Sequence, residues 1–128
     1  MQRTKPQKLG QHGQNLEHRL AAYGGEVIIT INEFAEKKGS RHVSDQLLRS
    51  GSGAGAHYAE ARSSQSRRDF IHKVSLAAKE VRESLHWIRV AAHAGLRPHD
   101  ELRPSIREAE ELVAILFACM NTARKNSS

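Results

Sequence analysis

The sequence predicts an all-α protein, an antiparallel up-down four-helix bundle. Apolar residues recur every three or four positions in four separate stretches, and this spacing places them on one face of a helix. Two of these stretches begin with a serine followed three positions later by an acidic residue, which is a helix N-cap signal. Because short connections join the stretches, neighbouring helices are expected to run antiparallel around one core.

The first helix is predicted from Leu16 to Phe34, ahead of a break at Gly39-Ser40. Its apolar face consists of Leu16, Leu20, Tyr23, Val27, Ile31 and Phe34. Two features oppose it: Gly24-Gly25 costs about 2 kcal/mol relative to two alanines, and the β-branched residues 27–31 are typical of a strand. A helix is still favoured, because the apolar spacing continues through both features and no neighbouring stretch offers a partner strand.

The second helix is predicted from Arg41 to Ser63. Its inner face consists of Val43, Leu47, Ala54, Tyr58 and Ala61. The run of serine, glycine and alanine at 50–56 has low helix propensity, which by itself predicts a break. Small residues also let two helix backbones approach closely, and we therefore expect the helix to continue through them.

The third helix has the clearest pattern, beginning at the N-cap signal Ser66-x-x-Asp69 and ending at Gly95. Its apolar face consists of Phe70, Val74, Ala77, Val81, Leu85, Ile88 and Ala92. The fourth helix is predicted to begin near Pro104-Ser105, where Ser105-x-x-Glu108 repeats the cap signal. Its apolar face consists of Ile106, Ala109, Leu112 or Val113, Leu116, Cys119 or Met120, and Ala123.

The length of 128 residues suggests one domain. Residues 1–14 are predicted to be a disordered basic tail, residues 15–125 to form the bundle, and residues 126–128 to fray. The sequence contains neither an apolar run of about 18 residues nor the apolar core of a secretory signal. We therefore expect a cytoplasmic protein with no membrane partner, and its single cysteine excludes an internal disulfide.

The net charge is +6, and such an excess favours polyanionic partners. The surplus lies in residues 1–15 and 41–73. The candidate nucleic-acid-binding residues are Arg41, Arg49, Arg62, Arg67, Arg68 and Lys73. Arg62, Arg67 and Arg68 are expected to gather at one end of the bundle. Few aromatics accompany them, so any binding is expected to follow the phosphate backbone with little sequence preference. The alternative is a solvated surface that keeps the protein soluble.

Motifs for catalysis, metals or cofactors are weak. A di-metal bundle needs two Glu-x-x-His motifs, and the sequence has one, Glu83-x-x-His86. The glycines at 51–55 lack the Gly-Lys-Ser/Thr ending of a phosphate loop. Cys119 lies on an apolar helix face, which favours a core role over a nucleophile. We therefore expect no catalytic residues, no metal and no cofactor.

Three segments together resemble a known family. They are residues 46–61 (QLLRSGSGAGAHYAEA), 65–73 (QSRRDFIHK) and 78–88 (AKEVRESLHWI). Their pattern resembles the small four-helix bundle proteins encoded in intervening sequences of bacterial 23S ribosomal RNA genes. The likeness extends from Leu16 to Ala123. His57 departs from it, because relatives typically carry asparagine there.

This resemblance implies a homopentameric ring of four-helix bundles without catalytic residues. It also implies a distant likeness to the accessory proteins of diversity-generating retroelements, which are basic pentamers that bind nucleic acid and a reverse transcriptase. The matching polar residues are Gln46, Glu60, Lys79, Glu80 and Glu83. They are interpreted as inter-helix or inter-subunit pairs rather than as a site.

Two functions follow from the sequence. The first is a non-enzymatic oligomeric protein whose basic surface binds RNA or DNA. The alternative is a scaffold ring that holds a protein partner without nucleic acid. Self-association is expected on physical grounds too, because some apolar residues lie beyond a single helix face and would stay exposed in a monomer. These are Ile28, Ile71, Leu76, Trp87 and Val90.

Overall fold

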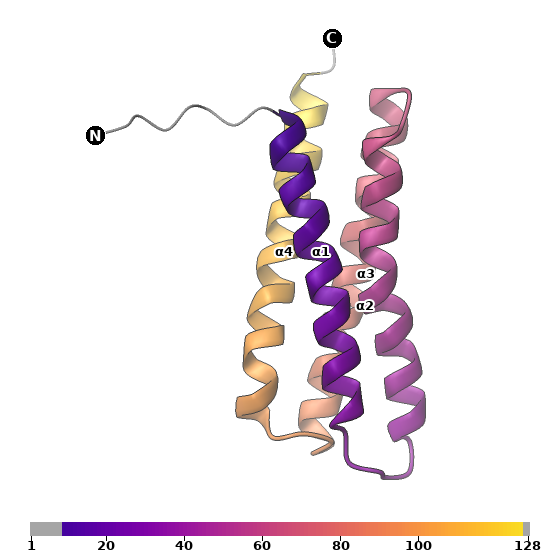
Figure 1. The fold of residues 1–128 in the computed structure, drawn as a ribbon, viewed down its shortest axis with the longest axis vertical. Helices are drawn as coiled ribbons and strands as arrows, with labels where there is room; N and C mark the ends of the chain where they lie inside the picture. Colours follow the sequence, from indigo (N-terminus) through magenta and orange to yellow (C-terminus); the bar gives the residue numbers. More distant parts are fainter. Residues whose placement is uncertain (1–8, 127–128) are drawn as a thin grey trace, which may run out of the picture.

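The computed structural model describes residues 9–126 as four antiparallel helices that form one bundle (Figure 1). They are α1 (Leu9–Asn32), α2 (Ser40–Arg62), α3 (Arg67–His93) and α4 (His99–Lys125). Each helix packs on the next along the chain, α2 and α3 most extensively, while α1 and α4 close the bundle through the smallest shared surface. The described part contains no strand, and the predicted all-α four-helix fold is confirmed.

The core lies along the bundle axis and consists mainly of leucine, valine and alanine. Leu20, Leu47, Ile88, Leu112 and Leu116 have almost no exposed surface and come from all four helices. Burying each such side chain contributes about 1.5–3 kcal/mol, which makes this apolar column the main source of stability. The predicted apolar faces supply these residues, so the helical spacing in the sequence identified the core correctly.

The β-branched segment 27–31 is helical, as predicted. Val27 and Thr30 are buried, whereas Ile28 and Ile29 face outward, as a helical period requires. Helix α1 ends at Asn32, slightly before the predicted end, and the next two residues complete a tight turn. In that turn the N–H groups of Glu33 and Phe34 donate to the carbonyls of Thr30 and Ile31. Gly39 then adopts φ 92°, which favours glycine, before α2 begins at Ser40.

The glycine-rich middle of α2 continues as an unbroken helix because α1 packs closely against it. A Cβ atom added at Gly51 would lie 2.7 Å from Cγ2 of Val27. Gly24 of α1 faces the same place, since a Cβ there would lie 3.4 Å from the carbonyl oxygen of Gly51. Packing between the two backbones thus outweighs the low helix propensity of residues 50–56.

Two predicted helix starts were wrong, that of the first helix and that of the fourth. Helix α1 begins at Leu9, so residues 9–14 belong to the bundle and not to a disordered tail. The reason is tertiary packing: Gly13 lies against the Tyr58 hydroxyl and the Arg62 side chain of α2. Residues 1–8 of the predicted tail lie outside the described residues. At the other end α4 reaches Lys125, and of the predicted frayed end only Asn126 is described.

Helix α4 begins at His99, more than a turn before the predicted start at Pro104-Ser105. Leu102 is fully buried and anchors this extra turn, while Asp100 and Glu101 favour it through the helix dipole. Pro104 therefore lies inside the helix. Close to the helix start its missing N–H removes only one hydrogen bond.

The described helices also bear on membrane topology. None of them is long and apolar enough to cross a bilayer.

We predict opposite effects for two glycine substitutions in the α1–α2 pair. Gly51→Ala should lower the free energy of unfolding by about 1–3 kcal/mol, because its methyl group would overlap Val27. Gly25→Ala is the matched control: nothing in its own chain lies within 4 Å of the added Cβ, so higher helix propensity should raise the stability of the bundle by up to about 1 kcal/mol. Urea unfolding of both variants tests this, and an equal response of the two would contradict the packing argument.

The fold also contains a buried phenol. The hydroxyl oxygens of Tyr23 and Ser84 lie 2.7 Å apart. Ser84 donates its own proton to the carbonyl of Val81 at 2.6 Å, so the Tyr23 hydroxyl donates to Ser84. Burial disfavours the phenolate and raises the pKa of Tyr23 to about 12.

This raised pKa makes stability depend on pH at the alkaline end. Between pH 10 and 12 the unfolded chain loses the phenol proton before the folded chain does, so the free energy of unfolding should fall as pH rises. Tyr23→Phe should be less stable by about 1 kcal/mol at pH 8 and should show a flatter decline above pH 10. Denaturant titrations at several pH values measure this, and an unchanged slope would refute it.

Candidate nucleic-acid interface

The six residues predicted to bind nucleic acid do not form one patch. Arg62, Arg67 and Arg68 lie at the same end of the bundle, around the turn from α2 to α3, as expected. Arg41 lies at the opposite end of α2, about 31 Å away along the helix axis. Arg49 lies between these ends, in the middle of α2.

Most of these side chains already have partners within the chain. Arg62 pairs with Glu17 of α1 at 2.9 Å, and Lys73 pairs with Asp69 one turn earlier in α3 at 3.4 Å. Arg67 donates to the backbone carbonyl of Asn126, at the end of α4. Among the described residues Arg41 and Arg68 form no ion pair. The end cluster is therefore less available to phosphate groups than its sequence suggests.

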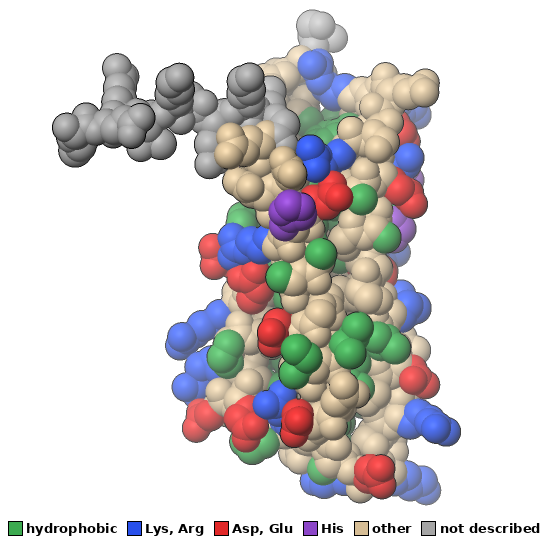
Figure 2. Space-filling view, in the orientation of Figure 1, with side chains coloured by type: hydrophobic (Ala, Val, Ile, Leu, Met, Phe, Trp, Pro, Cys, Tyr) green, Lys and Arg blue, Asp and Glu red, His purple; other side chains and the backbone are tan. Residues whose placement is uncertain are grey.

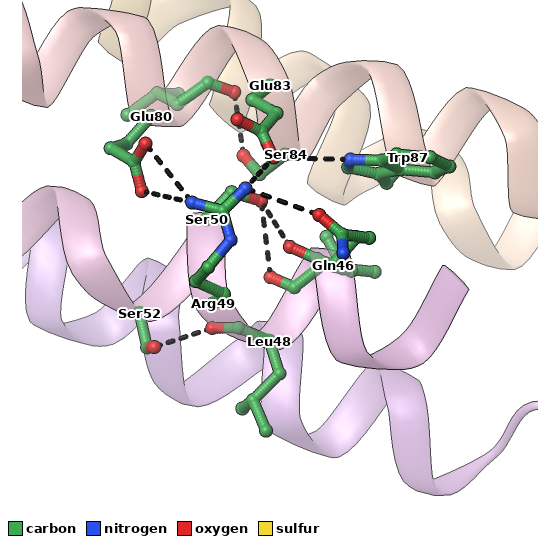
Figure 3. A network of polar contacts seen from close by, with 11 residues as sticks. Gln46, Leu48, Arg49, Ser50, Ser52, Glu80, Glu83, Ser84 and Trp87 are labelled. Atoms are coloured by element: carbon green, nitrogen blue, oxygen red, sulfur yellow. Dashed lines mark hydrogen bonds and ion pairs between the residues drawn. The ribbon is translucent and has the colours of Figure 1, made fainter. Parts of the chain in front are cut away.

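Arg49 belongs to a polar network that joins α2 to α3 (Figure 3). Its guanidinium lies 3.3 Å from Oε2 of Glu80, contacts Glu83, and donates to Oε1 of Gln46 at 3.3 Å. Glu83 also accepts from the Trp87 indole N–H at 3.4 Å. Two carboxylates thus balance one guanidinium, so Arg49 serves to link the helices and is a poor phosphate ligand. The pairing interpretation of Gln46, Glu80 and Glu83 fits this geometry.

The outward side of α3 carries a row of mainly basic side chains. Of the six candidate residues, only Arg68 belongs to this row, and it lies at one end. The positions of the row are separated by alternating intervals of four and three residues, so they lie along one side of the helix. We call this row the α3 stripe, and its members are Arg68, His72, Ser75, Lys79, Arg82, His86, Arg89 and His93. All are exposed except Ser75, which is half-buried. The stripe contains no acidic residue.

Exposed basic residues of α4 lie beside the α3 stripe and widen the basic surface. Arg82 lies over the ring of Phe117, 6.0 Å from its centroid, and Arg89 pairs with Glu110 at 3.1 Å, which places the two helices side by side. Seven of the exposed cations of the two helices form what we call the cationic face: Arg68, Lys79, Arg82, Arg89, Arg103, Arg107 and Arg124. Of the exposed carboxylates of α4, Glu110 and Asp100 each pair with an arginine of this face, Glu101 pairs with Arg97, and Glu111 pairs with Arg19 of α1.

The α3 stripe was missed because charge was counted along the chain. There Glu80 and Glu83 offset Lys79, Arg82 and Arg89. In space the two carboxylates turn towards Arg49 of α2, and the cations turn away from it. The signal that could have identified the stripe is the four-three spacing of basic residues, the same spacing that identified the apolar face.

The opposite side of the bundle, formed by α1 and α2, lacks charge over a wide area. Figure 2 looks onto α1 and shows hydrophobic side chains gathered over the lower half of α1 and towards α2. Ile28, Ile29 and Leu48 are 46%, 56% and 43% exposed. We call this region the uncharged face. It consists of Ala21, Ala22, Gly25, Ile28 and Ile29 of α1 with Leu48, Ser52, Gly55 and Ala59 of α2.

Of the apolar residues expected to be exposed, Ile28 is the one that clearly is. Ile71, Leu76, Trp87 and Val90 are half-buried instead. For Trp87 the reason is local: the rings of His42 and His86 pack against the indole edge to face, at centroid distances of 5.4 and 4.9 Å. Ile29 and Leu48, which the sequence did not single out, supply exposed apolar surface in their place.

The described residues contain no group of three or more side chains that could hold a metal ion. Glu83 of the Glu83-x-x-His86 motif is occupied by Arg49 and Trp87. Cys119 is half-buried in α4, and burial raises the pKa of its thiol, which disfavours the reactive thiolate. No arrangement for nucleophilic catalysis appears around it in the described part of the chain.

The family model for 23S rRNA-intervening sequence proteins matches residues 21–118. The chain belongs to this family. Among solved structures it is similar to a protein of unknown function from the S23 ribosomal protein family of Bacteroides thetaiotaomicron, with a TM-score of 0.79 and 22% identity. That match covers 85% of this chain and 97% of the other, and at this identity it establishes the shared fold. No curated protein gives a match.

Proposed function

We propose that this intervening-sequence protein is a non-enzymatic, self-associating protein that binds the phosphate backbone of RNA or DNA in the cytoplasm. The observation that carries the proposal is the cationic face. Seven arginine and lysine side chains are exposed there, and two of them, Arg89 and Arg103, are paired with the carboxylates Glu110 and Asp100. Surfaces of this kind attract polyanions by releasing the counterions that surround the phosphates.

The dimensions of the cationic face suit an extended ligand. From Arg68 to His93 the stripe is about 38 Å long, and a duplex advances about 34–36 Å in one turn. The only exposed large aromatic side chain among the described residues is Phe117, and Arg82 lies over it. Base stacking on a row of aromatics therefore contributes little, which favours phosphate contacts with slight sequence preference.

The uncharged face is the proposed contact between copies of the chain. The α1–α2 side and the α3–α4 side lie opposite one another in the bundle, so a contact through the uncharged face does not itself cover the cationic face. A closed ring of five is head-to-tail, so the uncharged face of one copy would meet a different surface of the next copy. The stoichiometry of five comes from the family resemblance. Several cationic faces in one assembly would engage a long polyanion together, which raises the overall affinity beyond that of one copy.

The alternative is a scaffold that uses the same assembly to hold a protein partner without nucleic acid. The surplus of arginine and lysine on the cationic face favours a polyanion over such a partner. This alternative becomes the better explanation if nucleic acid does not bind at low salt.

We predict that neutralising the middle of the cationic face weakens binding to nucleic acid. Lys79→Gln/Arg82→Gln should reduce affinity for a 20-base-pair duplex about tenfold or more at low salt. It should also lower the salt slope by about 0.9 for each phosphate that the variant no longer neutralises. Fluorescence anisotropy at 50 and 200 mM salt, with RNA and DNA, measures both quantities.

The matched control is Lys38→Gln/Arg41→Gln, which removes one lysine and one arginine from exposed positions just before and at the start of α2. It should bind almost as well as the wild type. Equal losses in both variants would show a general charge effect and would argue against a specific face. Absence of wild-type binding at 50 mM salt would overturn the proposed function.

We also predict that charge on the uncharged face disrupts the assembly. Ile28→Glu/Leu48→Glu should convert the oligomer to monomers at micromolar concentration, because two buried carboxylates would be costly in a subunit contact. Native mass spectrometry measures the state, and circular dichroism confirms that the bundle is intact. A wild-type protein that is monomeric, or a variant that assembles normally, would refute the assignment of this face.

A further inference from the structure

A pocket of about 850 Å³ opens at the end of the bundle that carries the α2–α3 turn. Its floor is apolar and draws on all four helices, including Leu16, Tyr58, Phe70, Ile115 and Cys119. This volume is within the range of small-molecule sites in proteins. Neither the cationic face nor the uncharged face contributes to it.

Ion pairs join α1 to α4 farther down the bundle from the pocket. Arg19 of α1 lies 2.7 Å from Glu108 and 3.0 Å from Glu111, both on α4. Between these ion pairs and the end of the bundle, His12 and Gly13 of α1 line the pocket. On α4 the pocket is lined by Ala118, Thr122 and Ala123. These residues leave the end of the core uncovered, so half-buried Phe70 and Ile115 border open space.

The mouth of the pocket is cationic. Arg62 and Arg67 line it, and among the described residues no aspartate or glutamate does. Because Arg62 is paired with Glu17, Arg67 is the arginine of the mouth that can bind an anion. Arg67 uses part of its five-donor guanidinium on the carbonyl of Asn126, another lining residue, and the remaining donors are available for a ligand. At the start of α3, Ser66 accepts from the backbone N–H of Asp69, and the N-terminal end of the helix adds partial positive charge beside Arg67.

An apolar floor beneath a cationic mouth selects a ligand with an apolar body and an anionic head. We propose that this end pocket binds an amphipathic carboxylate, with its acyl chain along the apolar floor and its carboxylate on Arg67. The chain's own residues 1–8 have the wrong charge for this role, because they carry three basic and no acidic side chains. A bidentate arginine–carboxylate contact fixes the head group.

Cys119 provides a direct readout. It is the only cysteine of the chain and is half-buried in the pocket floor, so the rate at which a thiol reagent modifies it reports whether the pocket is occupied. Dodecanoate, below its micelle concentration, should slow modification by DTNB at least fivefold. Dodecyltrimethylammonium, which has the same chain and a cationic head, should slow it less than twofold.

Two variants test where the ligand lies. Arg67→Gln should raise the half-saturating concentration of dodecanoate about tenfold. Arg68→Gln is the matched control, because Arg68 is the neighbouring arginine but does not line the pocket, and it should leave that concentration unchanged. Ala118→Trp should fill the pocket and abolish the effect of dodecanoate, with circular dichroism confirming the fold of each variant.

The proposal is overturned if dodecanoate leaves the Cys119 rate unchanged, or if the cationic amphiphile slows the rate equally. It is overturned too if Arg68→Gln loses as much affinity as Arg67→Gln, which would indicate a general charge effect. These outcomes are independent of nucleic-acid binding, because the Lys79 and Arg82 side chains lie on a different surface.

Discussion

The close contact between α1 and α2 is the constraint on which the arrangement of this bundle depends. Gly51 allows Val27 to pack where any larger residue would overlap it, and Gly24 faces the same contact from the other helix. This brings Ile28 of α1 and Leu48 of α2 onto one outer surface. The same small residues that make the helix pair possible also leave its outer side uncharged, and this is the surface proposed as the contact between copies.

The second determinant is how the carboxylates are used. Glu17 binds Arg62, Glu80 and Glu83 bind Arg49, and Glu108 and Glu111 bind Arg19, each across a contact between two helices. Few carboxylates remain for the outer side of α3 and α4. A modest net charge is thereby converted into one strongly cationic face, because the opposite charges lie between the helices rather than being spread over the surface. The ion pairs themselves are partly exposed and add little stability, so their larger effect is on where the charge lies.

The weak contact between α1 and α4 has a different consequence. The ion pairs of Arg19 with Glu108 and Glu111 raise the pKa of the Arg19 guanidinium further and keep it charged. At the end of the bundle that carries the α2–α3 turn, the described residues leave part of the apolar core uncovered, with Arg67 beside it. The three surfaces of the molecule thus differ in chemistry although all are built from the same four amphipathic helices.

The sequence by itself determined the class of fold, the four helices and most of the core. The apolar spacing of residues such as Leu20, Leu47, Ile88 and Leu116 depends on the helical repeat alone, which is a local property. The family resemblance likewise required only the linear pattern of residues 46–88. What spacing could not determine were the helix starts at Leu9 and His99, because packing of Gly13 and Leu102 against distant residues decides them.

The candidate site shows the same division more sharply. A count of charge along the chain directed attention to Arg49, whose charge the tertiary structure balances with Glu80 and Glu83. It overlooked Lys79 and Arg82, which the fold turns outward. Which charges are balanced depends on residues more than 30 positions apart, and only the packing of α2 against α3 decides it. Sequence determined how many charges this protein has, and tertiary structure decided which of them lie on one outer surface.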